Sequence, residues 1–430
     1  MGALCSFPIP HSNCRHKLRE SKTSAGTRLM VRASATDRLS ALSDDVLLNH
    51  ILSKISYRDV VRSSLLSQRW RFLWRKIPIL KFCSEDFEKQ KDDKIQAIIN
   101  NALLHLDARL HNLCLQVALD DPKAVDLNNW IRLAAEKQVE RMELQITRRY
   151  RKTRFKASSI AELGDSIFRC DNLTTIIVNN IDFPKVPTNF GILRSLKTIY
   201  CVDIWNVDDA MFEGFMDLCP HLQNLMISGC FGLKNLNLRS SNLTYLNLGI
   251  LRPDISLEIA CPRLMEISLM DYGPFTGLKL LQGISRAESV KKIVLQNYNT
   301  GNAVNRGIPS VTVLNSFPML EELTIHGQCF QEMISGEISV AEVTLPNLKM
   351  VHAHIGADKG GQAVIFLGFL LKNGPLCVTR VFLPKRCPRI MRNKLIDLEK
   401  DISKSRLFTA TGRWPMNPTD TCDLCDHYRV

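Results

Sequence analysis

One apolar pattern recurs through the middle of this 430-residue chain. An apolar residue is followed by a second one three positions later and by a third one two positions after that, as in Leu-x-x-Leu-x-Leu. The copies begin at Leu173, Leu196, Leu222, Leu243, Leu264, Val290 and Leu320, and Leu348-x-x-Val351 is a shortened last copy. The alternation at the end of each copy predicts a short strand with one buried face.

The spacing of these copies predicts a repeat architecture. Successive copies start 21 to 30 residues apart, which matches the period of leucine-rich repeats, roughly 20–29 residues. One unit cannot bury its leucines alone, so stacked units must share a continuous core and form a curved solenoid with parallel strands. The segments Leu113–Leu119 and Met142–Ile146 are expected to be earlier strands of the same array.

Prolines support this assignment. Pro220, Pro262, Pro318 and Pro346 each stand two residues before a leading leucine. Proline cannot continue a helix, and it favours an extended residue before it. We therefore expect each proline to end the returning limb of one unit and to begin the approach to the next strand.

The residues between the buried positions should lie on the concave face, because side chains alternate along a strand. They are mixed polar and aromatic residues without a concentration of charge, which suits a protein target and argues against nucleic acid. The residues predicted to contact the target are Tyr200, Asn224, Met226, Tyr245, Asn247, Glu266, Lys292, Glu322 and His326.

A different pattern occupies residues 37–82. Apolar residues recur at helical spacing over Leu39–Ile55 and again over Val60–Trp74. Ser43 is expected to cap the first helix and Asp59 the second, and Pro78 should end the pattern. A helical module of this length cannot bury a large core by itself. Its amphipathic faces are therefore expected to contact a partner or a neighbouring domain.

These residues resemble a known module. The run Asp37–Leu52 resembles the start of the plant F-box, and the run Val60–Trp74 resembles its second half. The family usually has Leu-Pro where this chain has Leu42-Ser43, and that proline helps to seat the first helix on the adaptor. The alternative is an unrelated helical hairpin.

The resemblance implies a function. It implies that the chain is the substrate-recognition subunit of an SCF-type ubiquitin ligase. Such a subunit binds a Skp-type adaptor on a cullin scaffold and holds a target protein on the repeats. The resemblance implies neither a catalytic residue nor a cofactor in this chain. The residues implied to form or support the adaptor contact are Leu42, Leu47, Ile51, Leu52, Val60, Leu65, Trp70 and Trp74. The alternative is a non-catalytic repeat scaffold whose F-box is degenerate or masked.

The C-terminal part resembles the FBD region that follows leucine-rich repeats in many plant F-box proteins. Ala363–Leu371 is predicted to be a helix, Val378–Leu383 a strand and Ile390–Leu407 an amphipathic helix. The expected organisation is thus mixed α/β: a leader (1–36), the F-box (37–82), a linker or start of the array (83–112), the repeats (113–350), a small α+β FBD-like region (351–410) and a tail (411–430).

The formal charge of +13 raises the question of an anionic partner. Basic residues gather locally at Arg148–Lys156 and Arg380–Lys394 rather than in one stripe. An RNA or anionic-ligand binder is therefore the least favoured hypothesis, and no nucleic-acid partner is expected.

The leader Met1–Thr36 is basic and rich in serine. It fits a disordered extension, an organelle transit peptide, or N-acylation at Gly2 with Cys5 as a second acylated residue. We expect the protein in the nucleus, the cytoplasm or both. No apolar run reaches about 18 residues, so no transmembrane segment is expected.

A search for catalytic and metal-binding motifs gave weak matches. Cys422-x-x-Cys425-x-His427 has half of the spacing of a zinc site and lacks a fourth ligand, so no metal is expected. His352 and His354 are predicted to be ordinary surface residues. Cys219 and Cys261 occupy equivalent positions, three before a leading leucine, and are predicted to be packing residues.

Overall fold

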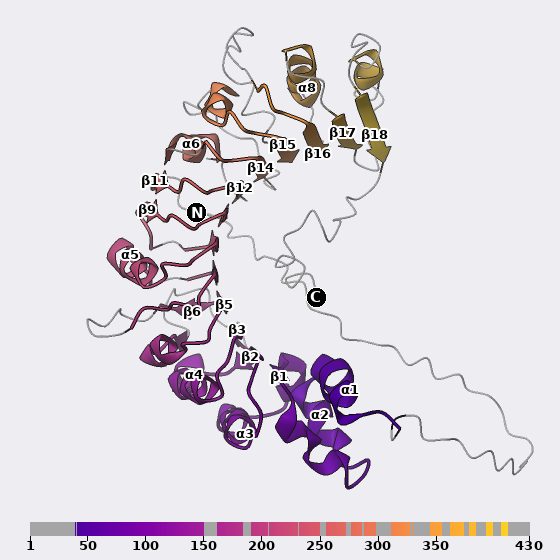
Figure 1. Cartoon of the computed structure of the whole chain (residues 1–430), viewed down its shortest axis with the longest axis vertical. Coiled ribbons are helices and arrows are strands. Elements are labelled where there is room, and N and C mark those ends of the chain that lie inside the picture. The colour runs from indigo at the N-terminus through magenta and orange to yellow at the C-terminus, as the bar shows by residue number, and fades with distance from the viewer. Residues whose placement is uncertain are drawn as a thin grey trace, which may run out of the picture.

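A computed structural model describes most of the chain between Leu39 and Thr411. The described residues are 39, 41–149, 161–183, 191–204, 206–230, 232–249, 255–271, 277–285, 288–297, 311–326, 329, 345–354, 362–373, 378–383, 393–398 and 406–411. They form an arc in which strands line the inner side and helices cover the outer side (Figure 1). The predicted mixed α/β solenoid, with a helical module at its N-terminal end, is confirmed.

The inner side of the arc is one continuous sheet. Within the described residues it has 13 strands, and every neighbouring pair is parallel. The strands, in their order across the sheet, are β1 (Ile79–Phe82), β2 (Asn112–Leu119), β3 (Arg141–Arg148), β5 (Thr175–Asn179), β7 (Thr198–Val202), β8 (Asn224–Ser228), β10 (Tyr245–Gly249), β12 (Glu266–Asp271), β14 (Lys292–Asn297), β15 (Glu322–His326), β16 (Met350–His354), β17 (Val378–Leu383) and β18 (Arg406–Thr411). All of the strands predicted from the apolar repeat are present.

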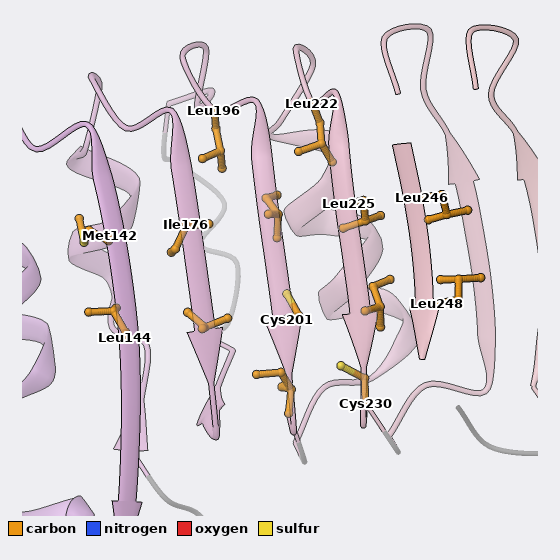
Figure 2. Close-up of a cluster of buried hydrophobic side chains, with 14 of the residues drawn as sticks. Met142, Leu144, Ile176, Leu196, Cys201, Leu222, Leu225, Cys230, Leu246 and Leu248 are labelled. Atoms are coloured by element: carbon orange, nitrogen blue, oxygen red, sulfur yellow. The ribbon is translucent and has the colours of Figure 1, made fainter. Parts of the chain in front are cut away.

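The apolar repeat builds the core between the sheet and the outer helices. The eight leading residues are all at most 3% exposed, from Leu173 to Leu348. Figure 2 shows the buried side chains of neighbouring strands lying next to one another, among them Ile176, Leu225 and Leu246. Burying one such side chain contributes about 1.5–3 kcal/mol, so each unit is stabilised mainly by contact with its neighbours.

The length of a unit is related to the structure of its returning limb, the segment that leads along the outer side of the arc from one inner strand to the next. Units with longer spacing return through a helix or a 3-10 turn. These elements are α3 (Asp92–Leu104), α4 (Leu127–Glu136), η6 (Asp165–Arg169), α5 (Asp209–Asp217), α6 (Gly277–Gln282), η7 (Val311–Ser316) and α8 (Gln362–Asn373), with short 3-10 turns at η4 (Ser84–Phe87) and η5 (Pro122–Ala124).

The two units that begin at Leu222 and Leu243 have the shortest spacing and return through strands instead. Here β9 (Asn235–Arg239) and β11 (Ser256–Ala260) form a second parallel sheet with β13 (Ile284–Ser285) on the outer side of the arc (Figure 1). A two-stranded sheet pairs β4 (Ala161–Glu162) with β6 (Ile181–Asp182). These outer strands were not predicted, although Leu233-x-x-Leu236-x-Leu238 repeats the motif that predicted the inner ones.

Neighbouring units are also joined by polar bonds at the prolines. The side chain of Asn242 donates to the carbonyl oxygen of Pro220 at 2.9 Å, and that of Asn347 donates to Pro318 at 2.9 Å. Ser289 donates to the carbonyl oxygen of Pro262 in the same way. The residue before a leading leucine therefore satisfies the carbonyl group of the preceding proline turn, which aligns successive units.

The N-terminal helical module is part of this same core. Its last segment is β1, which pairs with β2. Phe82 of β1 is fully buried, and its ring lies 4.9 Å from that of Tyr57 and 6.3 Å from that of Phe87. Ser56 donates a hydrogen bond to Asp86 at 3.1 Å. The module therefore caps the first edge of the solenoid, and the sheet crosses the expected boundary at residue 82.

The C-terminal region continues the sheet as well. The predicted helix Ala363–Leu371 is present as α8, and the predicted strand Val378–Leu383 is β17. The prediction of a helix over Ile390–Leu407 is wrong at its end: residues 393–398 are helical, but Leu407 lies in β18. Parallel pairing with β17 determines the conformation of this segment, and its helical periodicity does not.

The shared core predicts coupled stability. Phe82→Ala should lower the free energy of unfolding by about 3–5 kcal/mol, because it opens a cavity between the helical module and the repeats. Hydrogen exchange should then accelerate together in the helical module and in β2 and β3. The matched change Phe72→Ala, at a residue 57% exposed, should alter stability by less than about 0.5 kcal/mol. Acceleration confined to residues before β1 would contradict a shared core.

Candidate protein-binding surfaces

The N-terminal helical module begins with a capped turn. The hydroxyl group of Ser43 accepts a hydrogen bond from the backbone N–H of Val46, as predicted, and caps α1 (Asp44–Val46). The helix continues as a π-turn, η1 (Leu47–Ile51), and a 3-10 turn, η2 (Leu52–Lys54). Arg69 binds Asp44 at 2.6 Å and the carbonyl oxygen of Leu42 at 2.5 Å, which holds the start of α1 against the second half of the module.

The second half contains α2 (Tyr57–Ser63) and the 3-10 helix η3 (Trp70–Lys76). The prediction that Asp59 caps α2 is wrong. Ser56 occupies the cap position, and Asp59 lies inside the helix, where it pairs with Arg62 at 3.3 Å. Tyr57 packs edge-to-face against Trp74 with ring centroids 6.2 Å apart.

The structure divides the residues predicted to form or support the adaptor contact. Leu47, Leu52, Val60 and Trp70 are at most 4% exposed and form the core of the module itself. Leu42, Ile51 and Trp74 are half-buried and pack against that core. Leu65 is different, because it is 86% exposed. Most of this set therefore supports the module, and Leu65 alone is fully presented to solvent.

Other apolar side chains of the module are exposed together with Leu65. Among the described residues, eleven large hydrophobic side chains are exposed, and five of them lie between residues 39 and 72. These five are Leu39, Val61, Leu65, Leu66 and Phe72, and we call them the apolar surface of the module. Helical periodicity could not single them out, because it marks apolar positions without saying which contact the chain's own core.

The second surface is the concave face of the sheet. The register of the strands arranges its side chains in rows, such as Thr198, Asn224 and Tyr245, followed by Glu266 and Lys292. Of the residues predicted to contact a target, Tyr200, Tyr245 and Asn247 are at most 9% exposed. The remaining predicted residues, Asn224, Met226, Glu266, Lys292, Glu322 and His326, are half-buried.

Polar bonds fix several of these side chains. The amide of Asn247 donates to the hydroxyl group of Tyr245 at 3.1 Å, and that of Asn224 donates to the hydroxyl group of Thr198 at 3.1 Å. Lys292 forms an ion pair with Glu266 at 3.2 Å. The concave face is thus a preorganised surface of mixed polarity.

Comparison with known proteins finds matches to both parts of the chain that carry these surfaces. The family model of the F-box domain matches residues 39–82, and the model for the LRR repeats of FBD-associated F-box protein At5g56370 matches residues 127–274. The chain therefore contains a segment that matches the F-box domain and, after it, a segment that matches leucine-rich repeats of the FBD-associated type. The F-box match covers the module with the apolar surface, and the repeat match covers the strands from β3 to β12.

Several relatives come from Arabidopsis thaliana. F-box/FBD/LRR-repeat protein At5g56420 is 27% identical over 56% of this chain and 56% of its own length. FBD-associated F-box protein At5g38590 is 24% identical over 83% of this chain and 75% of its own length. F-box/LRR-repeat protein At3g26922 is 30% identical over 44% of this chain and 59% of its own length. The matched part spans about half the length of several of these curated relatives.

Among solved structures, an LRR protein of Leptospira interrogans matches 78% of this chain and 96% of its own, at 12% identity and a TM-score of 0.25.

The histidines at the C-terminal end of the concave face differ from the prediction. His352 is 6% exposed, and the rings of His326 and His354 stack in parallel with centroids 3.9 Å apart. The expectation that His352 and His354 are ordinary surface residues is wrong, because strand register places His354 beside His326. Burial and the neighbouring His352 lower the pKa of His326 to about 4. Burial, together with His326 and His352, lowers the pKa of His354 to about 2.

The basic segment Arg148–Lys156 is only partly described, to residue 149. Within that part, Arg149 is 14% exposed and lies 3.2 Å from Asp120 and 3.7 Å from Asp92. Asp92 also accepts hydrogen bonds from the backbone of Asp120 and Asp121, so this group joins the start of α3 to the ends of β2 and β3. Arg149 thus has a structural partner.

Two cysteines at equivalent repeat positions lie in the core. Cys219 and Cys261 are at most 3% exposed, as expected of packing residues, and desolvation by burial raises the pKa of Cys219 to about 12. The described part of the chain contains no group of three or more His, Cys, Asp or Glu side chains arranged to hold a metal ion. The Cys422–His427 motif, the leader and the tail lie outside the described residues. None of the described helices is long and apolar enough to cross a membrane.

The low pKa of His326 predicts acid sensitivity. Unfolded histidine titrates near pH 6.5, so below that pH the unfolded chain binds protons that the folded chain excludes. The free energy of unfolding should therefore fall with decreasing pH, by about 1.4 kcal/mol per pH unit for each such histidine, until His326 itself titrates near pH 4. Urea unfolding between pH 7.5 and 4.5 measures this slope.

His326→Gln should reduce the pH dependence of the free energy of unfolding by about 1.4 kcal/mol per pH unit, because one fewer histidine takes up a proton on unfolding. The control His221→Gln, at an exposed residue, should leave it unchanged. An equal slope in the wild-type protein and His326→Gln would contradict the assigned burial of this imidazole.

Proposed function

We propose that this chain is the substrate-recognition subunit of an SCF-type ubiquitin ligase. In this proposal the F-box binds a Skp-type adaptor, which is held on a cullin scaffold, and the concave face of the repeats binds a target protein. The observation that supports it most is the apolar surface of the F-box, whose five side chains stay exposed although the module packs against the repeats. Such a surface is characteristic of a contact site for another protein.

The contact with the adaptor would be mainly hydrophobic. Leu65 and Leu66 are 86% and 65% exposed, and burying each of them would contribute about 1.5–3 kcal/mol. The Ser43 cap and the bonds from Arg69 to Asp44 and Leu42 hold the start of α1 in place. These bonds would take over the part that a proline after Leu42 plays in related F-boxes, which supports a functional F-box over a degenerate one.

The proposed mechanism is proximity, and the chain itself is non-catalytic. Tethering a target to the ligase raises the effective concentration of its lysines near a conjugating enzyme carried by the scaffold. The continuous core from the F-box to the repeats supports this role, because a rigid connection limits the positions that the bound target can adopt.

The adaptor contact can be tested at exposed residues without disturbing the fold. Leu65→Asp with Leu66→Asp should reduce capture of purified Skp-type adaptor at least tenfold, because two charges would replace apolar contacts. The control Leu104→Asp changes a leucine that is 55% exposed on α3, outside the apolar surface, and it should bind normally. Leu47→Asp is unsuitable, since Leu47 is fully buried and its loss would unfold the module. Undiminished capture by the double variant would overturn the proposed contact.

The location of the protein distinguishes this function from the alternative of a scaffold with a masked F-box. We propose that the chain acts in the nucleus, the cytoplasm or both, where it can meet the adaptor. A C-terminal fluorescent fusion should give a nucleocytoplasmic signal. A signal confined to an organelle would favour the scaffold.

A further inference from the structure

We infer that the concave face binds an uncharged, apolar segment of the target protein, and that recognition does not depend on phosphate or acidic groups. This inference rests on the proposed function, because it specifies which chemistry the target presents to the repeats. It is based on four neighbouring strands at the centre of the sheet, β5, β7, β8 and β10.

The central strands carry no charged side chain on their concave side. The register places twelve concave positions in three rows, which we call the neutral face. The rows are Thr175, Thr198, Asn224 and Tyr245; Ile177, Tyr200, Met226 and Asn247; and Asn179, Val202, Ser228 and Gly249. Since 23% of the chain is charged, a set of twelve positions would be expected to include about three charges.

Charged residues begin on both sides of the neutral face. On one side, Glu143 of β3 accepts a hydrogen bond from Gln116 at 3.1 Å. On the other side, Glu266 of β12 forms its ion pair with Lys292 of β14. Glu143, Glu266 and Lys292 thus have partners within the chain. Arg141 of β3 also borders the neutral face, beside Thr175, and one nitrogen of its guanidinium is buried without a hydrogen-bond partner. All of these charges lie at the border of the neutral face and none lies within it.

The absence of charge determines which target chemistry fits. The neutral face is about 14 Å across its four strands and about 13 Å along them, from the ordinary strand spacing and rise. A carboxylate or phosphate buried at its centre on β7, β8 and β10, away from Arg141, would lose its water without gaining a counter-charge, at a cost of several kcal/mol. An apolar segment would lose little, and its polar backbone groups could bond to the neutral amides and hydroxyls around it.

Met226 is the expected centre of the contact. It lies in the middle row on β8 and is half-buried, between Tyr200 of β7 and Asn247 of β10, which are 1% and 2% exposed. A methionine on a floor of fixed side chains can adapt its flexible thioether to an apolar partner. The accessible part of the neutral face is completed by four other half-buried residues, Thr175, Asn179, Val202 and Asn224.

The test uses a peptide array, because the target is unidentified. Each random 12-residue sequence is synthesised in a neutral form, with glutamate substitutions, and with phosphoserine. The full-length chain, purified without the adaptor, should select neutral apolar peptides, and their Kd should change less than twofold between 50 and 500 mM NaCl.

Matched methionine variants locate the contact. Met226→Glu should weaken the selected peptides at least tenfold, and Met226→Leu should stay within threefold of wild type. The control Met265→Glu changes a methionine that is 46% exposed and precedes β12, and it should bind like wild type. Circular dichroism establishes that each variant is folded.

Four results would overturn the inference: selection of acidic or phosphorylated peptides, steep salt dependence, retention of no peptide, or normal binding by folded Met226→Glu. Self-association that Met226→Glu abolishes would assign the neutral face to a second copy of the chain and would also overturn it. Adaptor capture is measured on the same samples. Neutral peptide selection without adaptor capture would contradict the proposed ligase function only, and adaptor capture with acidic peptide selection would contradict this inference only.

Discussion

The burial of one row of leucines against the next is the interaction on which the structure depends. No unit of this chain encloses its own apolar residues, so each leading leucine is covered only when the neighbouring unit adds its strand in register. That requirement explains why all strands of the inner sheet run in parallel and why their order across the sheet follows the chain. It also explains why units of different length are tolerated, since the variable part of each unit lies on the outer side.

The same requirement gives the F-box a second role. An exposed first strand of a parallel sheet would leave both its edge and its apolar face open. The F-box covers this end of the solenoid with β1 and with the ring of Tyr57 against Phe82. A module of short helices thereby gains the core that it could not build alone, and the repeats gain a cap.

Much of this fold could be predicted from the sequence, because the alternation of apolar residues in each copy of the repeat directly predicts a strand. Each copy from Leu173 to Leu348 corresponds to an observed strand. The outer strands β9 and β11 were missed because the short units offered no contrast between a strand and a helix on the return. The end of the expected helix Ile390–Leu407 was mispredicted because pairing with β17 overrides local helical periodicity at Leu407.

The binding surfaces were harder to predict, since apolar residues such as Leu47 and Leu65 look alike in sequence and differ only in what covers them. The stacking of His326 on His354 depends on register between strands 28 residues apart, which one sequence does not display.

The continuity of the sheet from β1 to β18 has a geometric consequence for any protein held on its concave side. Neighbouring strands of a sheet lie about 4.8 Å apart and are rotated by a roughly constant twist. The number of strands between the F-box and a segment bound on the concave face would therefore set both the distance and the orientation of that segment relative to the F-box. Under the proposed function, gain or loss of one unit between these two points would turn a different side of the bound protein toward the ligase, even if every contact residue stayed the same.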